Sequence, residues 1–225
     1  MQTGKGQKGR AAGEAGFSLI ELMVALGVTL VIMVIASRML AMSMAVRARE
    51  NQRAEAVADV QRALQTMTRE ISNAALGLSG NGLVAADSDE LQIRVRSNLN
   101  AFCDVKAAST SPCDSDTADS GEDVVFAVIN NTTGGGGDNQ RLVTRQDINN
   151  SNSVSALANR VDGLKFVYVK SDGAETADAA QAQKVRITVT VTLPAVGTKG
   201  QAGYQPPSQI QLASEAVLRN RLLSQ

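Results

Sequence analysis

The chain of 225 residues contains no histidine and no tryptophan. Without histidine, a nucleophile triad lacks its usual general base and zinc lacks its commonest protein ligand. Aromatic residues make up only 3% of the chain, so a platform of rings that stacks on nucleic-acid bases has little to be built from. These shortages favour a protein that packs and assembles over an enzyme, and we predict no cofactor.

Charge of one sign is not in excess either. The 22 basic residues balance the 22 acidic residues, so the formal net charge at pH 7 is zero. This balance does not indicate a broad surface for binding nucleic acid, although a local basic groove remains an alternative. We therefore predict no nucleic-acid partner.

Proline is absent from the first 111 residues, and a long apolar run lies within them. The run covers residues 17–36, which is long enough to span the hydrocarbon core of a bilayer, and Glu21 is its one charged residue. The segment before it is basic, with three cations and one acid: Lys5, Lys8, Arg10 and Glu14. The positive-inside rule predicts that this segment stays in the cytoplasm.

The residues at the start of the apolar run carry a family resemblance. Gly16 followed by Phe17-Ser18-Leu19-Ile20-Glu21 resembles the cleavage and methylation motif of type IV pilins and type II secretion pseudopilins. In that family a prepilin peptidase cuts after the glycine and methylates the new amino terminus. The resemblance implies that residues 1–16 are a leader peptide, that Phe17 becomes the first mature residue, and that Glu21 meets the amine of a neighbouring subunit.

An ordinary signal sequence or signal anchor is the alternative, and hydrophobicity alone does not exclude it. A secretory signal ends at a small-residue cleavage site beyond its apolar core, whereas here the processing site lies before the apolar run. A carboxylate in a membrane helix is costly unless it is paired, so Glu21 indicates a functional role. A contact between Glu21 and the amine of its own chain is the alternative to a contact between subunits.

One continuous helix is predicted from Phe17 to about Leu76, where three glycines follow: Gly77, Gly80 and Gly82. Such a helix would be about 90 Å long. Up to about Val46 it is apolar nearly all round, which suits lipid or a bundle of similar helices. The domain boundaries that follow are a leader at residues 1–16, a transmembrane and assembly helix at 17–46, and a periplasmic part at 47–225.

Beyond Arg47 the helix becomes amphipathic. Apolar side chains recur at alternating spacings of three and four: Val57, Val60, Leu64, Met67, Ile71 and Ala74. We expect this stripe to pack on the protein's own sheet. A coiled coil with another chain is the alternative, but the stripe lasts for few heptads.

After the glycines the apolar period changes to two, which is typical of strands. Strands are predicted at residues 91–95, 124–129, 141–148, 164–168 and 185–193, with 124–129 central and Pro194 ending the last one. Four or five strands after one long helix predict an α+β fold. In that fold the long N-terminal helix packs on an antiparallel β-sheet head.

The head resembles two groups within the same family. The order of segments 161–168, 185–189 and 217–221 is similar to that of PilW-type minor pilins and of J-type pseudopilins. Many major pilins have a proline in the membrane helix, and the matching stretch around Arg38 has none. The resemblance therefore implies a minor type IV pilin, with a J-type minor pseudopilin of a type II secretion system as the alternative.

The only two cysteines, Cys103 and Cys113, bracket a short segment. If the head lies outside the cytoplasm, as the leader implies, the compartment is oxidising and a disulfide is expected. A metal pair is the alternative, but it lacks a nearby histidine or a further cysteine.

Five acidic residues lie close to the second cysteine: Asp114, Asp116, Asp119, Glu122 and Asp123. So many oxygen ligands could hold calcium, but their register differs from an EF-hand, since Ala118 falls where a third ligand is needed and Gly121 is displaced. We expect a solvated acidic loop and predict no metal site, with calcium as the weaker alternative.

Together these features predict a structural and assembly subunit that is not an enzyme. It would be anchored in the inner membrane by one helix, with its amino terminus cytoplasmic and its head periplasmic, and would then enter a pilus or pseudopilus. Its expected partners are the prepilin peptidase, the inner-membrane assembly platform, and minor and major pilins. A remote alternative is a signal-anchored periplasmic enzyme or binding domain, which would keep residues 1–16 and present a concave polar site.

Overall fold

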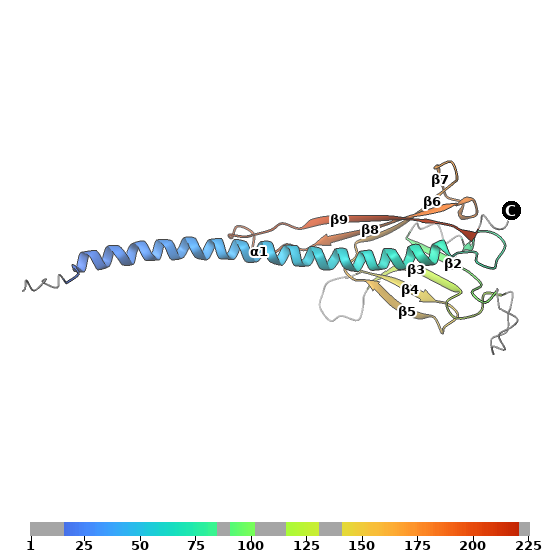
Figure 1. Ribbon diagram of the computed structural model, residues 1–225, viewed down its shortest axis with the longest axis horizontal. Helices are drawn as coiled ribbons and strands as arrows, with labels where there is room; N and C mark the ends of the chain where they lie inside the picture. Colours follow the sequence, from blue (N-terminus) through green and yellow to red (C-terminus); the bar gives the residue numbers. More distant parts are fainter. Residues whose placement is uncertain (1–15, 85–90, 102–115, 131–140, 221–225) are drawn as a thin grey trace, which may run out of the picture.

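Helix α1 (Leu19–Ser72) forms the long axis of the molecule, and the strands gather around its C-terminal half (Figure 1). The structure, a computed structural model, describes residues 16–84, 91–101, 116–130 and 141–220. The prediction of one unbroken helix is confirmed, with 54 residues in it. The helix ends at Ser72, slightly before the predicted end at about Leu76.

The early end of α1 follows from pairing between its C-terminal extension and a strand. The backbone N–H of Ala75 donates to the carbonyl of Arg96 at 2.9 Å, and the N–H of Arg96 donates to the carbonyl of Gly82 at 2.7 Å. These bonds replace helical ones, and Ala75 adopts a left-handed conformation with φ of 64°. The chain therefore leaves the helical path two residues before the first of the glycines.

Two antiparallel sheets are present in the described residues. The first has the order β1-β2-β3-β4-β5 and consists of β1 (Leu83–Val84), β2 (Gln92–Arg96), β3 (Asp123–Asn130), β4 (Arg141–Asp147) and β5 (Ser153–Ala158). The second has the order β7-β6-β8-β9 and consists of β6 (Gly163–Val169), β7 (Glu175–Thr176), β8 (Lys184–Leu193) and β9 (Ser208–Val217). A single 3₁₀ turn, η1 (Ala179–Gln181), precedes β8.

The predicted fold class is confirmed, because a long helix packs on antiparallel sheets in an α+β arrangement. The predicted central strand is β3, which lies in the middle of the first sheet, and β8 ends at Leu193, directly before Pro194. The prediction of one sheet with four or five strands was wrong, since the described residues form nine strands in two sheets. The strands missed include β5 and β9, in each of which a single residue is fully buried, so their sequences alternate weakly.

The apolar stripe of α1 lies inside the head. Val60, Met67 and Ile71 are completely buried, and they share one core with Phe126 of β3 and Ile187 of β8. The helix contacts β5 of the first sheet and both β8 and β9 of the second. The prediction that the stripe packs on the protein's own strands is therefore confirmed, and these buried side chains are not available for a coiled coil.

Two polar contacts fix the helix against the sheets at the same level. The guanidinium of Arg145 on β4 donates to the Glu70 carboxylate at 3.0 Å. The hydroxyls of Thr68 and Ser214 on β9 lie 3.1 Å apart. Each sheet is thus tied to α1 by a side chain on its own side of the stripe.

The connection between β8 and β9 extends well beyond the sheet and lies along α1 (Figure 1). We call residues 194–207 the hairpin tip. The guanidinium of Arg49 donates to the carbonyl of Pro194 at 2.7 Å and also donates to the carbonyl of Pro206. One arginine of the helix therefore holds both arms of the hairpin tip.

A glycine pair after α1 allows a test of how closely the helix end approaches β2. Gly82 has φ of +67°, and a Cβ there would overlap backbone atoms of Ala75 and Arg96, whereas Gly80 has φ of +100° and open space around it. Left-handed φ costs an alanine about 1–2 kcal/mol at either position, and overpacking adds about 1–3 kcal/mol at Gly82 alone. We expect Gly82→Ala to lower the free energy of unfolding by about 1–3 kcal/mol more than Gly80→Ala does.

Urea unfolding of the full chain in detergent micelles, followed by the β-sheet circular dichroism signal, measures this difference. The Gly80→Ala variant is the matched control for backbone strain. Equal losses in the two variants would contradict the close approach of the Gly82 backbone to Ala75 and Arg96.

Candidate functional site

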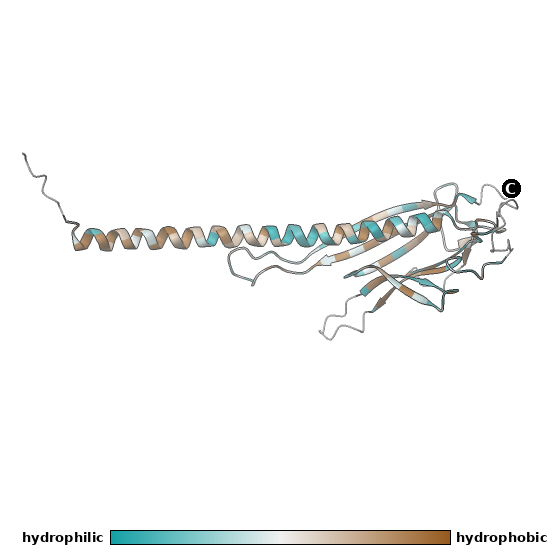
Figure 2. Cartoon of the chain, turned by 60° about the horizontal axis from the view of Figure 1, so that its bottom comes forward, coloured by the Kyte–Doolittle hydropathy of each residue, from teal (hydrophilic) through white to brown (hydrophobic). Residues whose placement is uncertain are grey.

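The N-terminal half of α1 projects from the head, every described residue before Ala45 is exposed, and the half is strongly hydrophobic (Figure 2). Nineteen large apolar side chains between Phe17 and Val46 are at least 50% exposed. α1 is long and apolar enough to cross a membrane, and none of its most apolar 18-residue window is buried.

Such an exposed surface is costly in water. Burying one large apolar side chain is worth about 1.5–3 kcal/mol, so the nineteen side chains together represent tens of kcal/mol. Contiguous apolar patches of this size mark surfaces that contact a membrane or another protein. This half of α1 therefore fits a membrane-anchored protein.

Two hydroxyl side chains within this half are suited to an apolar environment. The Thr29 hydroxyl donates to the carbonyl of Ala25, and the Ser37 hydroxyl donates to the carbonyl of Met33, both at 2.7 Å. Both donors are thus satisfied inside the helix, as a hydrocarbon environment requires.

Glu21 in this half has no such bond to its own helix. Its side chain is exposed and has no hydrogen bond or ion pair with any residue that the structure describes. It lies in the first turn of α1, where the helix dipole favours a negative charge. The free carboxylate is therefore available to a cation that this chain does not itself supply within the described residues.

The predicted processing junction lies just outside the helix. Gly16, Phe17 and Ser18 precede α1 without regular structure, and Phe17 is 84% exposed. Ser18 is the N-cap in an extended conformation, and its carbonyl accepts from the N–H of Leu22 at 3.1 Å. The bond between Gly16 and Phe17 is thus outside the helical hydrogen-bond ladder.

The acidic residues considered as calcium ligands contact other parts of the protein. Glu122 is 1% exposed, and its carboxylate accepts from the backbone N–H groups of Leu99 at 2.6 Å and of Asp119 at 3.1 Å. The Asp119 carboxylate accepts from the Asn100 amide at 2.7 Å, and the Asp116 carboxylate accepts from the N–H of Ala118 at 2.9 Å. These bonds fold the loop before β3 rather than converge on a common point.

Asp123 accepts from two arginines on the neighbouring strand β2. Arg94 donates through Nε and Nη2 at 2.7 and 2.6 Å, and Arg96 donates through Nε at 2.9 Å. Burial by itself would raise the pKa of Asp123, but hydrogen bonds from Arg94 and Arg96 outweigh it and hold that pKa below its ordinary value. The same contact with Asp123 raises the pKa of Arg94.

Sequence reasoning missed Asp147, which has the densest set of bonds in this region. Its carboxylate is nearly buried and accepts from the Ser120 hydroxyl at 2.9 Å and from the N–H of Gly121 at 2.8 Å. It also accepts from the backbone N–H groups of Asn149 and Asn150, at 3.1 and 3.3 Å. Asp147 therefore ties the loop before β3 to the end of β4, and its position near the end of the predicted strand 141–148 was the only sequence signal.

The described residues do not test the predicted disulfide, and they cover only part of the acidic cluster. Within the described residues, no three His, Cys, Asp or Glu side chains lie close enough to hold a metal ion. Asp114, Cys103 and Cys113 lie outside the described residues. The disulfide and the weaker calcium alternative therefore stay predictions.

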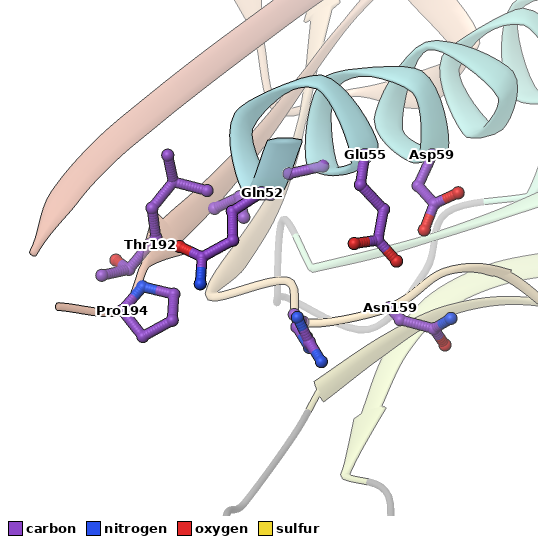
Figure 3. A pocket seen from close by; sticks show the side chains of 10 residues that line it. Gln52, Glu55, Asp59, Asn159, Thr192 and Pro194 are labelled. Carbon is purple, nitrogen blue, oxygen red and sulfur yellow. The ribbon is translucent and has the colours of Figure 1, made fainter. Parts of the chain in front are cut away.

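One cavity of about 150 Å³ lies between α1, the connection from β5 to β6, and the end of β8 (Figure 3). Glu55 and Asp59 extend from the helix on the side of Asn159, and Gln52 lies near Pro194 (Figure 3). The ten lining residues include no His, Cys, Ser or Lys. The polar wall of this cavity consists of two carboxylates, two amides, the Arg160 guanidinium and the Thr192 hydroxyl.

Comparison with known protein families agrees with the site at the start of α1. Residues 12–37 match the family model described as "Prokaryotic N-terminal methylation motif". The chain carries this motif, which is the signal of type IV pilins and pseudopilins. No curated protein matches the chain. The match covers the processing junction, Glu21 and the exposed apolar helix, and it supports a pilin or pseudopilin that acts as a structural subunit.

The contact of Asp123 with two arginines predicts how stability depends on pH. Because the pKa of Asp123 is lowered in the folded protein, its contribution is fully present above the unfolded-state pKa of about 3.9 and is lost as pH falls through the folded-state pKa. We expect Asp123→Asn to lower the free energy of unfolding at neutral pH by about 1–3 kcal/mol and to weaken its decline below about pH 4.

Urea unfolding in micelles across the acidic range checks this expectation. Asp162→Asn is the matched control, since Asp162 is exposed. Parallel pH profiles for the wild type and Asp123→Asn would show that the arginine contacts contribute nothing to stability.

Proposed function

We propose that the chain is a minor type IV pilin, a structural subunit that is processed by a prepilin peptidase and helps to initiate or cap a pilus. The observation that carries this proposal is an exposed apolar helix that begins three residues after Gly16 and carries an unpaired Glu21 in its first turn. In the membrane, lipid would cover this helix. In a fibre, the helices of neighbouring subunits would take the place of lipid.

The geometry supports a docking role for Glu21. Cleavage after Gly16 would create an amine at Phe17, and methylation leaves this amine able to carry a positive charge. Phe17 and Glu21 lie four residues apart, about 6 Å along a helix axis. In a staggered bundle, the amine of an incoming subunit would approach the Glu21 carboxylate of a docked one, and a low dielectric strengthens that attraction.

The proposed setting is a single pass through the inner membrane, with residues 1–16 in the cytoplasm and the head in the periplasm. Partners would be the prepilin peptidase, the assembly platform, and other pilins that contact the N-terminal helix. A J-type minor pseudopilin of a type II secretion system would share the same processing and differ in its neighbours, so cross-linked partners distinguish the two. In either role the subunit would be a substrate of an enzyme and not an enzyme itself.

The first test is the mass of the mature protein in membrane fractions. We expect loss of residues 1–16 and one added methyl group on the Phe17 amine, because the junction is exposed and lies outside the helix. Intact-mass analysis measures both changes. Cells without the peptidase serve as the control and should retain the full chain. A mature chain that still begins at Met1 in peptidase-positive cells would overturn the proposal.

The second test replaces the carboxylate. We expect Glu21→Ala to leave cleavage and membrane insertion intact and to reduce cross-linking to neighbouring subunits. A paired charge in the apolar zone is worth a few kcal/mol, and each 1.4 kcal/mol is a factor of about ten, so the reduction should be at least about tenfold. Photo-cross-linking in membranes gives the yield.

Matched variants separate charge from packing in that experiment. Glu21→Gln keeps the shape and removes the charge, so it should behave like Glu21→Ala. Thr29→Ala changes a polar residue of the same helix whose hydroxyl bonds only its own backbone, so incorporation should stay normal. Normal incorporation of Glu21→Ala would exclude Glu21 as the docking charge and would favour a contact within its own chain.

A further inference from the structure

The hairpin tip reaches the helix near the end of the exposed apolar half. Arg49 holds the carbonyls of Pro194 and Pro206, and within the tip the backbones of Val196 and Gln205 pair at 3.0 and 2.9 Å. The remaining residues of the tip extend further towards the N-terminus of α1. At Gly203 a Cβ would lie 3.0 Å from the Ala41 carbonyl oxygen, so the tip touches the helix four to eight residues before Arg49.

This contact lies at the level where a spanning helix leaves the hydrocarbon core. The run of residues 17–36 covers about 30 Å, the thickness of that core. Arg38 is the first cation after it, and Ala41 lies five residues, about 7.5 Å, beyond the end of the run along the axis. The headgroup layer on each side of the core is about 5–8 Å thick, so the tip contacts α1 within that layer.

The charge around the contact is mainly positive, although Glu50 follows Arg49 directly. Residues 38–49 of the helix and 194–207 of the tip contain four cations and no acidic residue: Arg38, Arg47, Arg49 and Lys199. Lys199 is exposed, and Tyr204, the one aromatic residue of the tip, is half-buried. Tyrosine and the long basic side chains are the residues that membrane proteins place at the headgroup level.

We propose that the hairpin tip is a second membrane contact, which lies in the headgroup layer beside α1 and binds anionic phospholipid headgroups through Lys199 and Arg38. The proposal rests on the membrane-spanning role of α1. Cations near an anionic bilayer surface are attracted to it, which matches the charge of this region. The tip has no exposed large apolar side chain among the described residues, so it fits a headgroup layer better than an apolar groove of another protein.

The contact would set the height and orientation of the head. A helix alone permits the head to rotate about the axis of α1 and to tilt with it. A tip fixed to the helix by Arg49 and to the bilayer by its cations adds a second point of attachment on one side. The head would then stand on the membrane in one orientation until the subunit is extracted.

The absence of tryptophan makes a direct measurement available. The full chain with Tyr204→Trp carries one tryptophan. This variant is reconstituted in vesicles of phosphatidylcholine and phosphatidylglycerol that contain lipid with a nitroxide on its headgroup. We expect the headgroup nitroxide to quench most of the emission. In vesicles of phosphatidylcholine alone the quenching should be weaker.

Two further single-tryptophan variants separate this proposal from the proposed function. Ile32→Trp reports on the exposed apolar helix and should be quenched by a nitroxide deep in the acyl chains. Val154→Trp lies on β5 beside Ser155. The Ser155 hydroxyl donates to the backbone carbonyl of Arg145, and the Arg145 guanidinium pairs with Glu70 of α1. That level is about 44 Å beyond Ala41 along the axis, so neither nitroxide should quench it.

The attachment of the tip to α1 is tested by a glycine pair. Gly203 and Gly200 have nearly equal φ values of +86° and +88°, but a Cβ at Gly203 would press on Ala41, Met42 and Ala45, whereas space is open at Gly200. In the Tyr204→Trp background, Gly203→Val should displace the tip and change its quenching. Gly200→Val carries the same backbone strain and should leave the quenching unchanged.

The outcomes are decisive in each direction. Deep quenching of Ile32→Trp with no headgroup quenching of Tyr204→Trp overturns the second contact and leaves the membrane helix in place. Absence of quenching in both variants overturns the membrane helix itself. Equal quenching of Tyr204→Trp in both kinds of vesicle overturns the assignment to anionic headgroups.

Discussion

The burial of one helical stripe between two sheets is the contact on which the rest of the structure depends. Val60, Met67 and Ile71 are removed from water completely, and the two sheets approach each other across the same core. Each side chain of this size contributes about 1.5–3 kcal/mol, which is the main force that keeps α1 attached to the head. Because the stripe occupies only the C-terminal half of the helix, the other half is left to find a different apolar environment.

Much of this arrangement could be predicted from the pattern of apolar residues, because the side chains on one face of a helix or strand share the same environment along its length. The stripe of α1, with its spacing of three and four, and the alternating strand β8 each place one face in the core. The strand β3, with its apolar run, has side chains of both faces in the core. Edge strands do not give such a signal. In β5 only Ala158 is fully buried, and in β9 only Ala216, so neither sequence has a fully buried apolar face, although backbone pairing makes both segments strands.

Long-range polar contacts were beyond prediction for a different reason. The start of α1, with Gly16, Phe17 and Glu21, is recognisable because its residues are adjacent in the chain. Arg49 and Pro194 are 145 residues apart, and the acceptor is a backbone carbonyl that every residue possesses. Asp147 likewise binds Ser120 and Gly121 across 26 or 27 residues. Carboxylates are dense near residue 120, and the sequence predicted a solvated acidic loop with calcium as the weaker alternative. In the described residues their oxygens accept bonds from backbone groups, arginines and an asparagine.

The two halves of α1 are mechanically one body, because no proline interrupts the helix and its 54 residues keep one hydrogen-bond ladder. Kinks in helices arise mostly at proline, at inserted side chains or at π-bulges. A displacement of the apolar half along its axis therefore moves the stripe with it, and the stripe moves the head, because pulling it out of the core would expose Met67 and Ile71 to water. Arg49 extends this coupling to the hairpin tip, since its two carbonyl acceptors belong to both arms of the β8–β9 connection. In the proposed function, head, hairpin and membrane half would thus travel together as the helix passes from lipid into a bundle of similar helices.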